Sequence, residues 1–329
     1  MDRLSPRGRR QVVGGLAALV AMPARAATVD ITAYGVVVAG PAGGRTDRWA
    51  DLLVPAIGRG FASRSLMVRQ NLGGIDGVTG ANQFEARVEP DGTTGLLVPG
   101  VAMLSWLTGE MRARFDPARW VPLWVGLSGV VLFSRTPLVQ GQPFRMTATS
   151  PAGPELPALL ALDILGIDVE LVPPDLPGGA VLVGPFSSMT PALATQAGFR
   201  PVMTFGILNA QGTIGRDPDY PDVPTAFELT IDRAPKDTLA ALRSAALATQ
   251  LDVGLVLPAL TPAASVALWR RACAALPADP VILEQASRTG TRQPSADQVA
   301  MCTTSITGTS GTLLTLRRWL ATRYDWRPA

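Results

Sequence analysis

Extended, glycine-rich and helical segments alternate along the first third of the chain, and this alternation restricts the fold more than any other feature of the sequence. The predicted strands are residues 29–38, 66–70 and 94–98. The predicted helices are residues 48–61, which Thr46 or Asp47 would cap, and residues 81–88. Glycine-rich loops, residues 40–44 and 71–80, follow the first two strands. A repeated order of strand, loop and helix is typical of a mainly parallel α/β sheet.

A second α/β block follows. Its predicted strands are residues 144–149, 168–172 and 181–183, and its predicted helices are residues 156–165 and a helix from about Pro191. Two C-terminal segments, residues 262–276 and 313–324, also have helical spacing. Arginines in the last segment (Arg317, Arg318 and Arg323) are interpreted as a solvated face.

Sheets of this kind bind ligands at the carboxyl ends of their strands, where the glycine-rich loops lie. Glycines let backbone N–H groups converge, and a helix N-terminus adds partial positive charge, so a carboxylate can be held without a basic side chain. The candidate ligand-binding residues are Ala42, Gly43, Gly44, Thr46, Asp47, Gly74, Asp76 and Gly77 in the first block, with Ser150, Gly153, Ser187 and Ser188 in the second. The alternative is that these glycines only make tight turns.

Three charged residues lie in or beside these loops. Asp47 is expected to cap a helix and hold ordered water rather than to contact an anion directly. Arg45 and Asp76 are solvated loop residues by default. The alternative is that either one reaches the ligand and alters selectivity.

The N-terminal segment has the composition of a secretory signal peptide. Four arginines between positions 3 and 10 precede the uncharged apolar run 11–22, and a small-x-small site ends at Ala26. The apolar run is shorter than the about 20 residues that span a bilayer. We therefore expect residues 1–26 to be removed and the mature protein to be periplasmic. Arg9-Arg10 leaves twin-arginine export and general secretion both open.

Charge and histidine content narrow the function. Residues 1–26 hold five of the 29 basic residues and one of the 26 acidic residues, so the remainder carries a net charge of −1. It has no basic run of the kind that nucleic-acid binding requires. The chain has no histidine, so Ser-His-Asp and Cys-His catalysis and most zinc catalysis lose their usual base or ligand. We expect no enzyme, no metal site and no cofactor.

The two cysteines, Cys273 and Cys302, leave two alternatives open. In an oxidising compartment they can form one disulfide that closes the C-terminal region. Otherwise they are buried thiols that act as small apolar residues.

Five motifs, in order, resemble those of the Bug-type receptors, the extracytoplasmic binding proteins of tripartite tricarboxylate transporters. They are residues 41–47 (PAGGRTD, like P-x-G-G-x-T-D), 71–80 (NLGGIDGVTG, like N-R-P-G-A-G-G-N-I-G), 89–93 (EPDGT, like the P-D-G-Y-T turn), 221–225 (PDVPT, like P-D-V-P-T) and 258–279, like a late helix that ends in A-L-A-D-P. Departures at Gly73, Asp76 and residues 172–176 mark the chain as a divergent member.

The resemblance implies a two-lobed type II periplasmic-binding-protein fold, with lobe one at residues 27–132 plus 253–329 and lobe two at residues 133–252. It also implies a soluble, monomeric receptor that closes on a small carboxylate and presents it to membrane transporter subunits. Two alternatives remain: a ligand sensor for a signalling partner, and an exported hydrolase on the same architecture.

Overall fold

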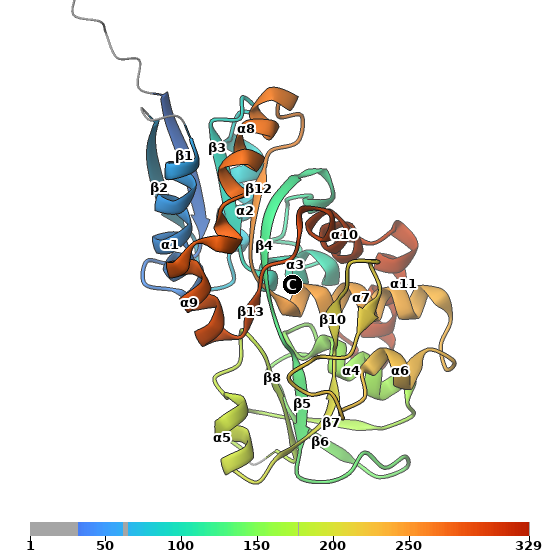
Figure 1. The fold of residues 1–329 in the computed structure, drawn as a ribbon. Helices are drawn as coiled ribbons and strands as arrows, with labels where there is room; N and C mark the ends of the chain where they lie inside the picture. Colours follow the sequence, from blue (N-terminus) through green and yellow to red (C-terminus); the bar gives the residue numbers. More distant parts are fainter. Residues whose placement is uncertain (1–31, 62–64, 177, 329) are drawn as a thin grey trace, which may run out of the picture. The chain divides into compact units, whose positions relative to one another are not determined.

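The computed structural model describes residues 32–61, 65–176 and 178–328. The predicted signal peptide, residues 1–26, and its cleavage site lie outside the described residues. The described chain contains two main sheets with helices packed around them (Figure 1).

The first sheet has the strand order β13-β4-β12-β3-β1-β2. Its strands are β1 (Thr32–Ala39), β2 (Ser65–Leu72), β3 (Thr94–Val98), β4 (Val121–Ser128), β12 (Leu251–Leu257) and β13 (Thr291–Arg292). β1 lies parallel to both β2 and β3, whereas β12 runs antiparallel between β3 and β4. The parallel core of this sheet is the one that the alternating sequence predicts.

The second sheet has the strand order β7-β6-β8-β5-β9. Its strands are β5 (Val131–Ser134), β6 (Phe144–Thr147), β7 (Val169–Val172), β8 (Ala180–Val183) and β9 (Arg200–Thr204). β6 lies parallel to β7 and β8, and β5 runs antiparallel between β8 and β9. A short hairpin, β10 (Ile207–Leu208) and β11 (Ile214–Gly215), follows.

The two sheets share an order of three parallel strands, then an antiparallel strand, then one more strand, β4 in the first sheet and β9 in the second. The first sheet also has the short edge strand β13 beside β4. The antiparallel strand of the first sheet, β12, follows the strands of the second sheet in sequence, and that of the second sheet, β5, follows β4 of the first. β4 leads through Gly129 and Val130 into β5 of the second sheet, and the chain returns to the first sheet only at β12. The predicted lobe boundaries after residues 132 and 252 fall inside β5 and β12.

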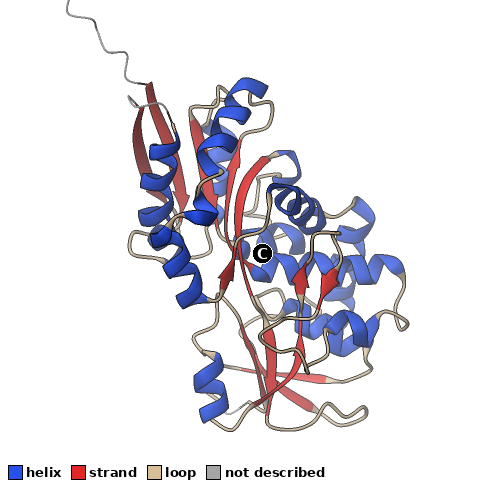
Figure 2. Ribbon diagram, viewed as in Figure 1, coloured by secondary structure: helices blue, strands red, loops and turns tan. Residues whose placement is uncertain are grey.

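Helices connect the strands and cover both faces of the first sheet (Figure 2). They are α1 (Arg45–Gly60), α2 (Val78–Arg87), α3 (Gly100–Thr108), α4 (Leu156–Ile164), α5 (Pro191–Gln196), α6 (Ala226–Thr230), α7 (Lys236–Gln250), α8 (Ala263–Cys273), α9 (Pro280–Thr289), α10 (Ala296–Thr307) and α11 (Ser310–Tyr324). Short 3-10 turns lie at Pro117–Arg119 and Leu276–Ala278. α1, α2 and α3 each follow one of the parallel strands β1, β2 and β3, so their N-termini all lie at the carboxyl edge of the first sheet.

The hydrophobic core has two main parts. One covers the face of the first sheet that carries α1 and α8, with Trp49 and Trp269 at 2% and 0% exposure. The other is continuous from the opposite face of the first sheet into the second sheet. α7 lies within it and packs against α3, α4, α10 and α11. Small residues such as Ala241, Ala245 and Ala248 are fully buried on α7, which allows these helices to approach closely.

The C-terminal helix corrects one prediction. Arg318 is exposed as expected, but Arg317 donates hydrogen bonds to the carbonyls of Trp106 (2.8 Å) and Leu107 (3.0 Å) at the end of α3. Arg323 is exposed as well, and it pairs with Asp163 (3.0 Å) and with Asp168. The contact of Arg317 with α3 forms because carbonyls at a helix C-terminus lack intrahelical donors and accept from other groups.

Both cysteines are free and buried. Cys273 lies in the core part that includes Trp269, and Cys302 lies in the part that surrounds α7. The structure therefore contains two buried thiols and not the disulfide, because the two residues belong to different parts of the core.

Candidate functional site

A cleft of about 550 Å³ lies where the carboxyl ends of the parallel strands of both sheets meet. Its lining from the first sheet is Pro41, Gly44, Arg45, Thr46, Arg48, Ile75, Asp76, Pro99 and Val101. Its lining from the second sheet is Pro154, Pro185, Phe186, Ser187 and Ser188. The cleft thus combines the β1–α1, β2–α2 and β3–α3 loops on one side with the loops after β6 and β8 on the other.

The β1–α1 loop brings the start of α1 into the cleft. Gly43 has φ +74°, and Gly44 is the N-cap, with its N–H donating to the carbonyl of Pro41 (3.0 Å). A Cβ at Gly44 would lie 2.9 Å from that carbonyl, so the turn itself needs glycine. The first N–H groups of α1 have no intrahelical acceptor and carry the positive end of the helix dipole. This edge of the cleft favours an anion.

Asp47 joins the first two loops from below the cleft surface. Its carboxylate accepts hydrogen bonds from the Gly43 N–H (2.7 Å) and from Asn71 Nδ2 (2.8 Å) at the end of β2. Burial by itself raises the pKa of Asp47, but these two bonds and the charge of Arg69 outweigh it, so the pKa lies below its usual value of 3.8. The predicted capping role is corrected: Gly44 is the N-cap of α1, and Asp47, within the first turn, reaches back to the loop.

The β2–α2 loop adds a second helix start. Gly77, with φ +73°, is the N-cap of α2, and a Cβ there would lie 2.7 Å from the ring of Pro99. Asp76 Oδ1 accepts a hydrogen bond from the N–H of Val78 (3.1 Å), and its carboxylate also pairs with Arg112. Asp76 therefore lines the cleft with its charge already compensated.

The second side of the cleft is formed by short turns with hydroxyl groups. Ser187 Oγ accepts a hydrogen bond from the N–H of Met189 (3.0 Å), and Ser150 Oγ accepts one from the N–H of Ala152 (3.2 Å). Both hydroxyls stabilise their own turns. Ser188 is exposed at the cleft, and its hydroxyl has no hydrogen-bond partner among the described residues. Of these hydroxyls, that of Ser188 is the one best placed for a ligand.

Two arginines line the cleft, and their charges are compensated differently. Arg45 pairs with Asp252, with Nη2 2.8 Å from Oδ2, and the Asp252 side chain is fully buried. Arg48 is exposed and donates to the carbonyl of Gly43 (2.9 Å). No carboxylate of the described residues lies within 4.0 Å of its guanidinium. Since Arg45 and Asp76 are each neutralised by a partner, the charge of Arg48 is left in excess and favours an anionic ligand.

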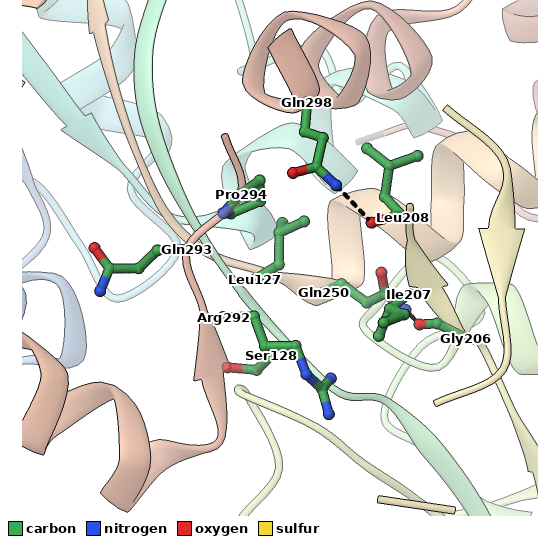
Figure 3. A pocket seen from close by; sticks show the side chains of 10 residues that line it. All are labelled: Leu127, Ser128, Gly206, Ile207, Leu208, Gln250, Arg292, Gln293, Pro294 and Gln298. Carbon is green, nitrogen blue, oxygen red and sulfur yellow. Dashed lines mark hydrogen bonds between the residues drawn. The ribbon is translucent and has the colours of Figure 1, made fainter. Parts of the chain in front are cut away.

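A smaller cavity of about 200 Å³ lies beside the crossing between the sheets (Figure 3). Gln298 Nε2 donates to the carbonyl of Leu208 (3.1 Å), and Gln250 Nε2 donates to that of Gly206 (2.8 Å). Arg292 Nη2 pairs with buried Asp217 Oδ1 (2.7 Å). These contacts tie the segment after β9 to β13 and α10, so this cavity belongs to the connection between the sheets.

The structure brings together part of the predicted site. Gly44, Thr46, Asp76, Ser187 and Ser188 line the cleft. Ala42, Gly43, Gly74, Gly77, Ser150 and Gly153 lie in the same loops but do not line the cleft, and neither does Asp47 in the first turn of α1. The cleft also contains residues that the sequence did not predict as ligand-binding: Pro41, Arg48, Ile75, Pro99, Val101, Pro154, Pro185 and Phe186. A signal in the sequence could have indicated the third loop of the cleft. It is Pro99-Gly100 at the start of α3, which repeats the pattern of the first two loops.

The described residues include no group of three or more His, Cys, Asp or Glu side chains arranged to hold a metal ion. None of their helices is both long and apolar enough to cross a membrane.

No protein-family model matches the chain, and no curated protein matches its sequence. Solved structures do match. A TctC solute-binding protein from Polaromonas is 15% identical, with a TM-score of 0.63, over 88% of this chain and 98% of that one. The periplasmic binding protein BugD is 15% identical, with a TM-score of 0.53, over 88% and 97%. MatC from Rhodopseudomonas palustris, with bound malate, is 18% identical, with a TM-score of 0.51, over 87% and 98%.

The chain therefore has the α/β fold of the periplasmic solute-binding proteins, which confirms the predicted fold class. The resemblance to Bug-type receptors that the five motifs indicate extends to the fold, at low sequence identity.

Proposed function

We propose that this protein is a periplasmic solute-binding protein of the Bug type that captures a small organic carboxylate for a tripartite tricarboxylate-type transporter and catalyses no reaction. The cleft carries this proposal. It places the starts of α1, α2 and α3 and the excess charge of Arg48 on one side, opposite the Ser188 hydroxyl on the other. The malate bound to MatC is a ligand of this chemical class on the same fold.

Backbone N–H groups at the start of α1 and the Arg48 guanidinium can hold one carboxylate by charge-assisted hydrogen bonds. The remainder of the ligand would extend toward Phe186 and Ser188. A cleft of about 550 Å³ lies within the roughly 300–1,000 Å³ that small-molecule sites occupy. It leaves room for bridging water beside a small dicarboxylate.

The two sheets would form the centres of two lobes, with residues 27–132 and 253–329 in the first and residues 133–252 in the second. The chain crosses between the sheets at Gly129-Val130 and again between β9 and β12, and these segments would serve as the hinge when the lobes close. A closed, ligand-loaded monomer would then present a surface to membrane transporter subunits. Export by the segment 1–26 would place it in the periplasm.

The test is direct binding of small carboxylates to purified mature protein. Mass spectrometry of ligand released from natively purified protein, followed by calorimetry with malate, succinate, adipate and citrate, should identify a carboxylate that binds in a one-to-one complex. Arg48→Met should weaken its binding by roughly tenfold or more. Ser188→Ala should weaken it by roughly threefold to tenfold.

The matched controls are Arg87→Met on exposed α2 surface and Ser287→Ala on exposed α9 surface, which should leave affinity unchanged. If no carboxylate binds, or if Arg48→Met and Ser188→Ala bind as tightly as the controls, the cleft does not perform this function. Hydrolysis of generic esters or glycosides by the purified protein would favour the exported hydrolase.

A further inference from the structure

We propose that the protein carries a second binding site, on α6 and α7, for a small carboxylate with an apolar tail. The site is a cavity of about 410 Å³ that shares no lining residue with the cleft. Its lining is Thr213, Ile214, Phe227, Ile231, Lys236, Leu239, Ala240 and Arg243.

The walls of this cavity are mainly apolar. Phe227 of α6 is anchored against the core around α7, and Leu239 and Ala240 are contributed by α7 itself. Ile231, just after α6, is 61% exposed, although an apolar side chain of this size gains free energy when it is covered. A concave apolar surface of this volume suits a hydrocarbon group.

The charged groups of the cavity are both cations. Arg243 Nη2 donates to the carbonyl of Gly212, and its Nε is buried without an acceptor among the described residues. No carboxylate of the described residues lies within 4.0 Å of the charged nitrogens of Arg243 or Lys236. A partly buried guanidinium that faces no counter-anion is costly, and an anionic ligand would relieve that cost. Since the cations border an apolar cavity, the ligand that fits is an amphipathic carboxylate.

The test uses octanoate as the probe, titrated into the purified mature protein by calorimetry. We expect one octanoate per chain in this cavity. Hexanoate should bind about fifteenfold more weakly, because it lacks two CH₂ groups and each buried CH₂ strengthens binding by about fourfold. Octanol, which lacks the charge, should bind at least tenfold more weakly than octanoate.

Variants locate the site. Arg243→Met should weaken octanoate binding by roughly tenfold. Ile231→Gln and Lys236→Gln change exposed side chains and should weaken it severalfold without disturbing the core. Arg233→Met, which removes an exposed cation nearby that does not line the cavity, is the matched control and should bind octanoate normally. Ser188→Ala in the cleft should also leave octanoate affinity unchanged.

Three results would overturn the proposal: no binding of octanoate, equal binding by the Ile231→Gln and Lys236→Gln variants and the control, or loss of octanoate binding in Ser188→Ala. A concentration-dependent dimer in ultracentrifugation that Ile231→Gln abolishes would also overturn it, because a second copy of the chain would then cover the cavity.

Discussion

Arg45 and Asp252 form a two-point ion pair that joins the first residue of α1 to the second residue of β12. The fully buried carboxylate of Asp252 also accepts hydrogen bonds from Trp49 Nε1 (3.0 Å) and Thr291 Oγ1 (3.1 Å). Thr291 Oγ1 lies 3.0 Å from the hydroxyl of Ser128 at the end of β4. A continuous polar network thus leads from the cleft to the point where the chain crosses to the second sheet.

The first prediction tests this network. Arg45→Met should lower the free energy of unfolding by about 3 kcal/mol, because it leaves a buried carboxylate without its cation. The matched control is Arg59→Met in the last turn of the same helix, whose exposed pair with Asp279 should contribute no more than about 1 kcal/mol. Urea unfolding of both variants measures the difference. Equal losses would contradict the assignment, and Arg45→Met/Asp252→Asn should recover part of the stability.

The second prediction concerns Glu155, beside the cleft at the N-cap of α4. Burial raises the pKa of its carboxyl to about 7, against a small opposing effect of its own backbone N–H, and Oε2 has no hydrogen-bond partner among the described residues. The pKa of this carboxyl is higher in the folded protein than the value of 4.5 in the unfolded chain. Its contribution to the free energy of unfolding is therefore fully present below pH 4.5 and is lost as the pH rises to about 7.

Glu155→Gln should therefore match the wild type at pH 4 and exceed its stability at pH 8, by up to roughly 3 kcal/mol. Thermal unfolding at both pH values checks this, with Glu89→Gln on exposed surface as the control. A Glu155→Gln effect that does not change between pH 4 and pH 8 would show that this carboxyl titrates normally.

The third prediction concerns the thiols. Burial raises the pKa of both Cys273 and Cys302 to about 12, with a small opposing effect of Arg243 on Cys302, so neither should react with a thiol reagent at pH 8 while the protein is folded. In denaturant without reductant, two thiols per chain should titrate. Their absence under those conditions would show that the two cysteines are bridged.

The fourth prediction concerns processing. Exported protein should begin at Ala27, because the small-x-small site at residues 24–26 follows the apolar run. N-terminal sequencing checks this, and a sequence that begins at Met1 would rule out cleavage. Replacement of Arg9-Arg10 by two lysines distinguishes the routes: twin-arginine export should fail, whereas general secretion should continue.

The sequence allowed most of the parallel core to be predicted. The predicted strand at residues 94–98 coincides with β3, and the helix at residues 156–165 with α4 to within one residue. The strands on either side of the first crossing between the sheets, β4 and β5, were not predicted. They form one nearly continuous apolar segment that is buried on both faces, so it lacks the alternation by which a strand and its sheet are recognised. The helix α7 was not predicted either, although its end marks the return to the first sheet at β12.

The features that could be predicted from the sequence alone are those set by residues close together in the chain. Gly43 and Gly77 adopt left-handed φ angles, and such positions can be inferred from a few neighbouring residues. The tertiary structure decided which loops share one cleft and which charges remain there. Arg45 is neutralised by a residue 207 positions away, and Arg48 is not neutralised by any described carboxylate. A side chain's net charge in a site depends on partners that only packing brings within a few ångströms, because Coulomb interactions act through space and not along the chain.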